Sequence, residues 1–245
     1  MSSQLSLFAP EDRSDPWLVR ISQRARRLSV RVYPGGKVEI VVPPRVKPVT
    51  VQRFIGQHRE WIDRRVLEWR AAATPIPVRP EHLELKALGR HYHIEYRSAA
   101  GATRVRARLD KAPDLLEVSG AIDNLRRVAA ALERWLRQQV KEAMEANLRQ
   151  LSLECRLDFG RLRVRRQRTR WGSCSSKGTL SLNVCLAFLD PAVVRYLLVH
   201  ELCHTRHMNH SRRFWALVEQ HEPDYRQLNQ ELNKGWRQVP AWILL

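Results

Sequence analysis

The sequence predicts an α+β protein with an antiparallel sheet beside a helical core and a smaller hairpin-plus-helix lobe at the N-terminus. Three patterns predict this class: alternating apolar and polar residues over 18–43, a second set of short alternating runs over 83–118, and helical periodicity over 48–73 and 123–153. A chain of 245 residues is long enough for one large domain or two small ones.

The N-terminal elements follow from turn residues and periodicity. Residues 18–43 alternate around Pro34-Gly35-Gly36, which predicts a β-hairpin with a glycine-rich turn. Residues 48–73 place apolar side chains on one helical stripe. Thr74-Pro75-Ile76-Pro77 and Pro80 predict a stiff linker. We therefore expect an N-terminal lobe over 17–75.

The first 16 residues are polar and contain acids. They lack the basic start and apolar centre of a secretory signal, so we expect a flexible tail and a cytoplasmic protein. No apolar run approaches the ~18 residues of a membrane span.

The middle of the chain reads as a strand-rich insert over 81–121. His91 and His93 share one strand face, which allows a metal pair, but ordinary polar positions on a half-exposed strand are favoured because no third ligand lies near in sequence. The long helix over 123–153 follows, with Asp123 as its expected cap. This helix begins the C-terminal core, which we expect over 122–240.

A second hairpin is expected over Leu162–Cys185. Trp171-Gly172-Ser173-Cys174 and Lys177-Gly178 supply its turn, and Asp190-Pro191 then starts the next helix with proline in the first turn. A closing helix is expected over Asp224–Trp236.

The helix after Asp190 carries His200-Glu201-Leu202-Cys203-His204. At about 100° per residue, His200 and His204 lie ~40° apart around the axis and ~6 Å apart along it, so both imidazoles can bind one zinc ion. Glu201 can reach a water held by that ion, which is the arrangement that metal-assisted hydrolysis uses. The core is therefore expected to be zincin-like.

The third zinc ligand has two candidates. His210 falls on the far side of a continuous helix, so it can bind only if the helix ends first, and Met208-Asn209 offers such an end, with Ser211 as the next cap. His207 lies on the same face as His200 if the helix runs on. We favour His210, because three ligands along one straight stripe would not surround a tetrahedral ion.

Net charge and cysteine content bear on the binding partners and on the redox state that the sequence predicts. The formal net charge of +18 is compatible with polyanions as partners, although an arginine-rich composition is the favoured explanation. The arginines cluster ahead of the zinc motif at Arg161, Arg163, Arg165, Arg166, Arg168 and Arg170. The four cysteines form no Cys-x-x-Cys pair and are expected to be free thiols.

Several of these segments together resemble the YgjP-like metallopeptidases, bacterial relatives of the SprT-like zinc proteases. The resemblance spans about residues 17–240 and rests on Arg24–Leu28, His58–Ile62, Arg170–Ser175, His200–His204, Asn209–Ser211, Phe214-Trp215 and Pro223–Tyr225. It implies one Zn²⁺ per chain held by His200, His204 and His210, with Glu201 as the catalytic base.

The expected activity is hydrolysis of a peptide bond. Arg170, Trp171, Gly172, Ser173 and Asn209 are candidate substrate-binding residues, and Arg170, His207, Asn209 and Tyr225 are candidate donors to the developing oxyanion. The segment from Trp171 can pair with an extended peptide, or it is a turn whose tryptophan lies in the core.

Two alternatives remain open. The first is a zinc phosphohydrolase that acts on nucleotides through Arg166, Arg168 and Arg170. The second is a zinc module that binds nucleic acid without catalysis.

Overall fold

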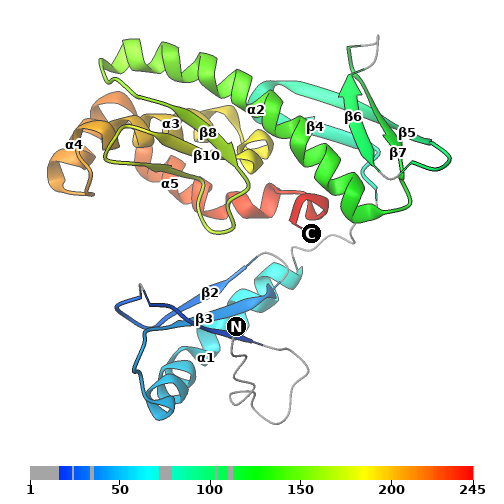
Figure 1. Ribbon diagram of the computed structural model, residues 1–245. Helices are drawn as coiled ribbons and strands as arrows, with labels where there is room; N and C mark the ends of the chain where they lie inside the picture. Colours follow the sequence, from blue (N-terminus) through cyan, green and yellow to red (C-terminus); the bar gives the residue numbers. More distant parts are fainter. Residues whose placement is uncertain are drawn as a thin grey trace. The chain divides into compact units, whose positions relative to one another are not determined.

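The computed structural model describes residues 17–23, 25–33, 36–71, 79–102, 104–109 and 113–244. The expected N-terminal tail, the Pro34-Gly35 turn and the 74–77 linker lie outside these residues. The chain forms two compact units, one up to Pro75 and one from Ile76 onward, and each is described by itself (Figure 1).

In the first unit, the residues that the structure describes form a three-stranded sheet and one helix. Its elements are β1 (Leu18–Ile21), β2 (Ser29–Val32), β3 (Val38–Val42) and α1 (Pro48–Ala71). The β2–β3 hairpin is antiparallel, and β1 adds to the other side of β3 in parallel. The buried Val38, Ile40 and Val42 of β3 pack with Val51 and Ile62 of α1, which joins sheet and helix.

The described residues of the second unit form two sheets and four longer helices. Its strands are β4 (His82–Leu85), β5 (Arg90–Ser98), β6 (Val105–Leu109), β7 (Leu115–Gly120), β8 (Leu162–Arg165), β9 (Gly172–Cys174) and β10 (Leu180–Asn183). Its α-helices are α2 (Leu125–Cys155), α3 (Pro191–Arg206), α4 (Arg212–His221) and α5 (Tyr225–Lys234). Short 3₁₀ segments are η2 (Lys86–Leu88), η3 (Val184–Phe188), η4 (Gly235–Gln238) and η5 (Ala241–Leu244).

The α+β class is confirmed, but the sheets are mixed rather than antiparallel. Each sheet contains one parallel pair: β1 with β3, β5 with β7, and β8 with β10. In the sheet of order β4-β5-β7-β6, β6 follows β5 in the sequence but forms the edge of the sheet. The next strand, β7, then lies between β5 and β6. Alternating patterns show that strands exist but do not order them, which is why this topology was missed.

The expected Leu162–Cys185 hairpin is also corrected. Strand β8 lies parallel on one side of β10, and β9 lies antiparallel on the other, so the tight hairpin is β9–β10. Gly172–Cys174 is a strand rather than part of a turn. The true turn closes at Gly178, whose φ of 69° favours glycine.

Helix α2 is the long central helix of the second unit (Figure 1). Its cap is Asn124, whose side chain accepts a hydrogen bond from the Arg127 amide, and not Asp123 as expected. The helix contacts β6 at one end and β8, η3 and α3 further along. Its buried face, including Leu132, Leu136 and Met144, joins both sheets to the C-terminal helices in one core.

Helices α4 and α5 both pack on α3, which begins as expected with Asp190 as cap and Pro191 in the first turn. The expected closing helix is present as α5 followed by η4. Among the described residues, no helix combines the length and apolar character needed to cross a membrane.

Candidate metal centre and active site

Three imidazoles converge at the end of α3. One ring nitrogen from each of His200, His204 and His210 lies within 4.8 Å of the others, and His200 Nε2 is 3.2 Å from His210 Nε2. Two nitrogens bound to one tetrahedral zinc at ~2.0–2.1 Å lie about 3.3 Å apart. The spacing therefore fits a shared metal ion.

The end of the helix brings His210 into this group. Helix α3 stops at Arg206, so His207 does not continue the stripe of His200 and His204. Ser211 then caps α4 by accepting a hydrogen bond from the Phe214 amide. Helix α3 thus ends one or two residues before Met208-Asn209, where the sequence predicted its end.

His207 supports the site through its backbone. Its carbonyl oxygen lies 3.1 Å from His204 Nδ1, so it accepts a hydrogen bond from that nitrogen when the proton is there. This contact leaves His204 Nε2 without a proton and available as a metal ligand. Burial lowers the pKa of His204, although this hydrogen bond opposes the effect.

His200 is also oriented through its Nδ1 atom, in this case by the hydroxyl group of Tyr196. The Tyr196 hydroxyl donates to Asn229 Oδ1 at 3.1 Å and lies 3.5 Å from His200 Nδ1. With its own proton given to Asn229, the hydroxyl oxygen accepts from His200 Nδ1–H, which directs Nε2 to the cluster. Burial, with smaller effects from His204 and His210, lowers the pKa of His200 to about 3, so the ring is neutral at physiological pH.

Aromatic rings form the floor beneath the imidazoles. The Phe214 ring centroid lies 4.9 Å from that of His200, 4.4 Å from that of His204 and 4.8 Å from that of His210. Trp215 stacks on His210, and Tyr225 stacks on Trp215. These contacts restrain the exposed His210 ring, which is the candidate ligand with the least support from α3.

Glu201 is buried beside the cluster, with 3% of its surface exposed. Its Oε2 has no hydrogen-bond partner among the described residues. Burial raises the pKa of Glu201 to about 8, against an opposing effect from the Arg170 charge. A buried carboxylate oxygen without a partner is costly. A hydrogen-bonding water or ion at this position would satisfy it.

Gly172 of β9 lies directly on Glu201. A Cβ added at Gly172 would lie 2.5 Å from Glu201 Oε1 and 2.9 Å from its Cδ, which is closer than real Cβ atoms approach other atoms. Glycine therefore allows the edge strand to contact the carboxylate.

Asn183, which is not among the predicted site residues, holds the segment that leads into β9. Its side chain is fully buried, donates to the carbonyl oxygens of Gln167 and Arg170, and accepts from the Cys185 amide. In the sequence, Leu180, Leu182 and Val184 alternate with Ser181, Asn183 and Cys185, a pattern that predicts the polar side of the strand for Asn183. The sequence signal for this role is an amide side chain directly before the unbroken apolar run 184–189.

The other predicted site residues occupy different environments. Trp171 is buried and stacks on Trp236, which matches the alternative in which this tryptophan lies in the core. Ser173 is half-buried on β9, whereas Arg170 and Asn209 are exposed. His91 and His93 are exposed on β5, with the ring of His82 from β4 nearby.

The four cysteines are free, as expected. Cys203, between the two helical histidines, is completely buried and acts as a small apolar side chain.

A family model for the YgjP-like metallopeptidase domain matches residues 26–235 of this chain. The chain belongs to the YgjP-like metallopeptidase family. Membership makes this YgjP-like domain a metal-dependent hydrolase of the peptidase type, and the family's metal is typically zinc. A comparison with curated protein sequences gives no match.

Two solved structures are similar to part of the YgjP-like domain. The metallopeptidase zymogen abylysin of Pyrococcus abyssi is 23% identical, with a TM-score of 0.36, covering 39% of this chain and 96% of that one. The metallopeptidase zymogen jannalysin of Methanocaldococcus jannaschii is 15% identical, with a TM-score of 0.34, covering 37% of this chain and 93% of that one.

Proposed function

We propose that this protein is a zinc-dependent peptidase in which His200, His204 and His210 hold one Zn²⁺ and Glu201 is the general base. The observation that carries the proposal is the cluster of three ring nitrogens within 4.8 Å of one another, next to a buried glutamate with a partnerless oxygen. When bound, a zinc ion lowers the pKa of a coordinated water and polarises a carbonyl group.

The chain's own groups carry out the proton transfers. Glu201 accepts a proton from the attacking water as its oxygen bonds to the carbonyl carbon of the substrate, and then delivers that proton to the leaving amine. The raised pKa of Glu201, about 8, suits a group that both accepts and donates near neutral pH. Among the candidate donors to the developing oxyanion, Arg170 is the one whose own charge acts on Glu201.

The edge of β9 supports an extended peptide as the substrate. Asn183 N donates to the Trp171 carbonyl and Ser175 N to the Thr179 carbonyl, so hydrogen-bonded pairs alternate along the β9–β10 ladder. The backbone groups of Gly172 and Cys174 therefore point away from β10. Since β9 ends the order β8-β10-β9, these groups can pair with a substrate strand above Glu201.

The decisive experiment compares zinc-loaded wild type with Glu201→Gln on casein, on unstructured peptides and on nucleoside triphosphates. We expect peptide cleavage that falls about 100-fold or more in Glu201→Gln, because general base catalysis is typically worth that much. Zinc content, measured by mass spectrometry, should stay at one per chain. Glu219→Gln, at an exposed position, is the control for loss of a carboxylate.

Release of pyrophosphate without any peptide cleavage, lost in Glu201→Gln, would instead favour the phosphohydrolase. Arg166, one of the arginines expected to line such a site, is held elsewhere, because it pairs with Glu133 and donates to the Ile243 carbonyl. The absence of any turnover by fully zinc-loaded protein would reject both enzymatic functions.

A further inference from the structure

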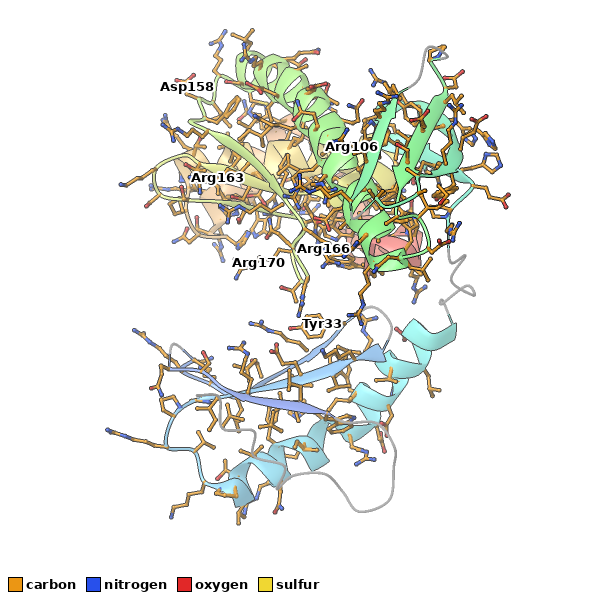
Figure 2. All side chains as sticks on the ribbon, turned by 45° about the vertical axis from the view of Figure 1, so that its right-hand side comes forward. Tyr33, Arg106, Asp158, Arg163, Arg166 and Arg170 are labelled. Atoms are coloured by element: carbon orange, nitrogen blue, oxygen red, sulfur yellow. The ribbon has the colours of Figure 1, made fainter. Side chains whose placement is uncertain are left out.

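A second group of histidines lies on the sheet β4-β5-β7-β6. It consists of His82 on β4 and of His91 and His93 on β5, and we call these three the sheet histidines. Figure 2 shows the side chains of this sheet and labels Arg106 on β6, the edge strand opposite to β4. In the sequence His91 and His93 have no third ligand nearby, but the pairing of β4 with β5 supplies one.

The register of the two strands places all three imidazoles on one face of the sheet. His82 is paired with His93 across antiparallel strands, and His91 lies two residues before His93, so the three side chains point to the same side. The intervening Leu83 and Tyr92 are buried, and the Tyr92 ring packs edge-on against a tryptophan of α2. The core therefore fixes the strands from the other face, and the sheet histidines are exposed.

The spacing of the rings suits imidazoles that share one ion. A metal ion ~2.0–2.1 Å from a ring nitrogen lies about 3.2 Å from the ring centroid, so two rings at a tetrahedral angle have centroids about 5 Å apart. The ring centroid of His82 lies 5.0 Å from that of His93 and 5.7 Å from that of His91. In the proposed metal centre on α3, the three corresponding distances are 4.9, 5.2 and 4.7 Å.

The sheet histidines differ from the proposed metal centre in the positions of their nitrogens. Among the described residues, the ligand atoms of His200, His204 and His210 all lie within 4.8 Å of one another, and those of the sheet histidines do not form such a group. Exposed side chains change rotamer within nanoseconds. A bound ion can therefore draw the three nitrogens together while the backbone of β4 and β5 stays in place.

A carboxylate lies on the same face. Glu84 is exposed and is paired with His91 across the two strands. A carboxylate in this position can accept a hydrogen bond from the ring nitrogen that does not bind the metal, which orients the ring and makes it a stronger ligand. On β5, Arg97 is paired with Glu95 and Glu117, so its positive charge is compensated. The face thus offers both the nitrogen ligands and the negative charge that favour a cation.

We propose that His82, His91 and His93 form a second binding site for a divalent transition-metal ion such as Zn²⁺, with Glu84 as the partner that orients His91. Imidazole nitrogens suit zinc and its neighbours in the first transition row better than they suit calcium or magnesium. The ion joins the edge strand β4 to β5 and thereby holds the edge of the sheet. This site does not depend on the metal centre of the proposed peptidase.

The test titrates the full-length protein, already loaded with one zinc per chain, with further Zn²⁺ in a calorimeter. NMR of isotope-labelled histidine ring nitrogens identifies the rings that bind. We expect one further zinc per chain, with shifts at the sheet histidines. His82→Gln/His93→Gln should bind it at least tenfold more weakly, and Glu84→Gln about tenfold, because loss of an outer partner alone costs about 10–100-fold in affinity. The matched control, His58→Gln/His221→Gln, removes two histidines outside both groups and should bind like wild type.

Three outcomes would overturn the proposal: no further zinc at micromolar free concentrations, shifts spread over the other histidines, or equal weakening in the control. The last two would show adventitious binding only. Circular dichroism checks that each variant is folded. His210→Ala should lose the zinc of the metal centre and keep that of the sheet histidines, so that failure of one site is measured separately from failure of the other.

Discussion

At the scale of single residues, the site depends on the contact between Gly172 and Glu201. This contact joins two segments that lie 29 positions apart in sequence, and a methyl group is enough to disturb it. The orientation of the carboxylate, and not only its presence, is therefore under the control of the edge strand.

We predict that Gly172→Ala loses most of the peptidase activity while it keeps its zinc. The new Cβ would have to displace the Glu201 carboxylate by about 1 Å, and misplacement on that scale costs about 100-fold in rate. Kinetics on a peptide substrate and zinc analysis check this. Gly56→Ala, where an added Cβ meets nothing within 4 Å, should leave both unchanged. Full activity in Gly172→Ala would show that the contact has no role in positioning the carboxylate.

Burial of Glu201 also predicts how the stability of the metal-free protein depends on pH. In the unfolded chain this carboxyl ionises near 4.5, but in the fold its pKa is about 8 because of burial. The folded state therefore holds an extra proton between these values, and the stabilisation present below pH 4.5 is lost as the pH rises to 8.

Glutamine cannot ionise, so Glu201→Gln should become more stable relative to wild type over this pH range. The difference in unfolding free energy should grow by on the order of 5 kcal/mol at most. Urea denaturation of both metal-free proteins between pH 4 and 9 measures it. A difference that does not change with pH would contradict the assignment of a strongly raised pKa. Added zinc should reduce the difference, since its charge stabilises the carboxylate.

At the scale of elements, the edge strand β9 has free backbone groups at Gly172 and Cys174. These groups are the ones that a substrate strand would use. The side chain of Cys174 is not required for such pairing, so backbone and side-chain effects can be separated at this one position.

We predict that Cys174→Pro raises KM for peptides strongly while zinc content is retained, because proline removes the outward amide without removing a donor to β10. Cys174→Ala keeps the amide and should behave like wild type. Steady-state kinetics of both variants on one peptide provides the comparison. Equal KM values in Cys174→Pro and Cys174→Ala would show that substrate does not pair with this edge.

At the scale of the whole molecule, the three histidines of the proposed metal centre all belong to the second unit, and the first unit has its own core. A ligand that binds the folded state stabilises the unit that binds it. Thermal unfolding should therefore respond to zinc in only one of the two units.

We predict that a chelator lowers the melting temperature of the second unit and leaves that of the first unchanged. Zinc at 1,000 times its dissociation constant would contribute about 4 kcal/mol. Differential scanning calorimetry with and without chelator tests this. His210→Ala, which removes the exposed ligand, should melt like chelated wild type and gain nothing from added zinc. A zinc effect on both transitions would mean that the units do not unfold independently.

Local geometry in this protein follows directly from the order of its residues. The spacing of His200 and His204 follows from helical geometry, and the start of α3 and the Ser211 cap follow from Asp190-Pro191 and from hydrogen bonding by serine. Residues within a few positions of one another act through fixed backbone geometry, so the pattern alone is sufficient.

The remaining features depend on the folded chain. It returned His210 to the other two rings, set Gly172 on Glu201, buried Asn183 under the segment before β9, and placed β7 between β5 and β6. These contacts join segments whose order in space depends on how the chain crosses the sheets. Side-chain alternation has the same period in every possible strand order and therefore cannot specify them.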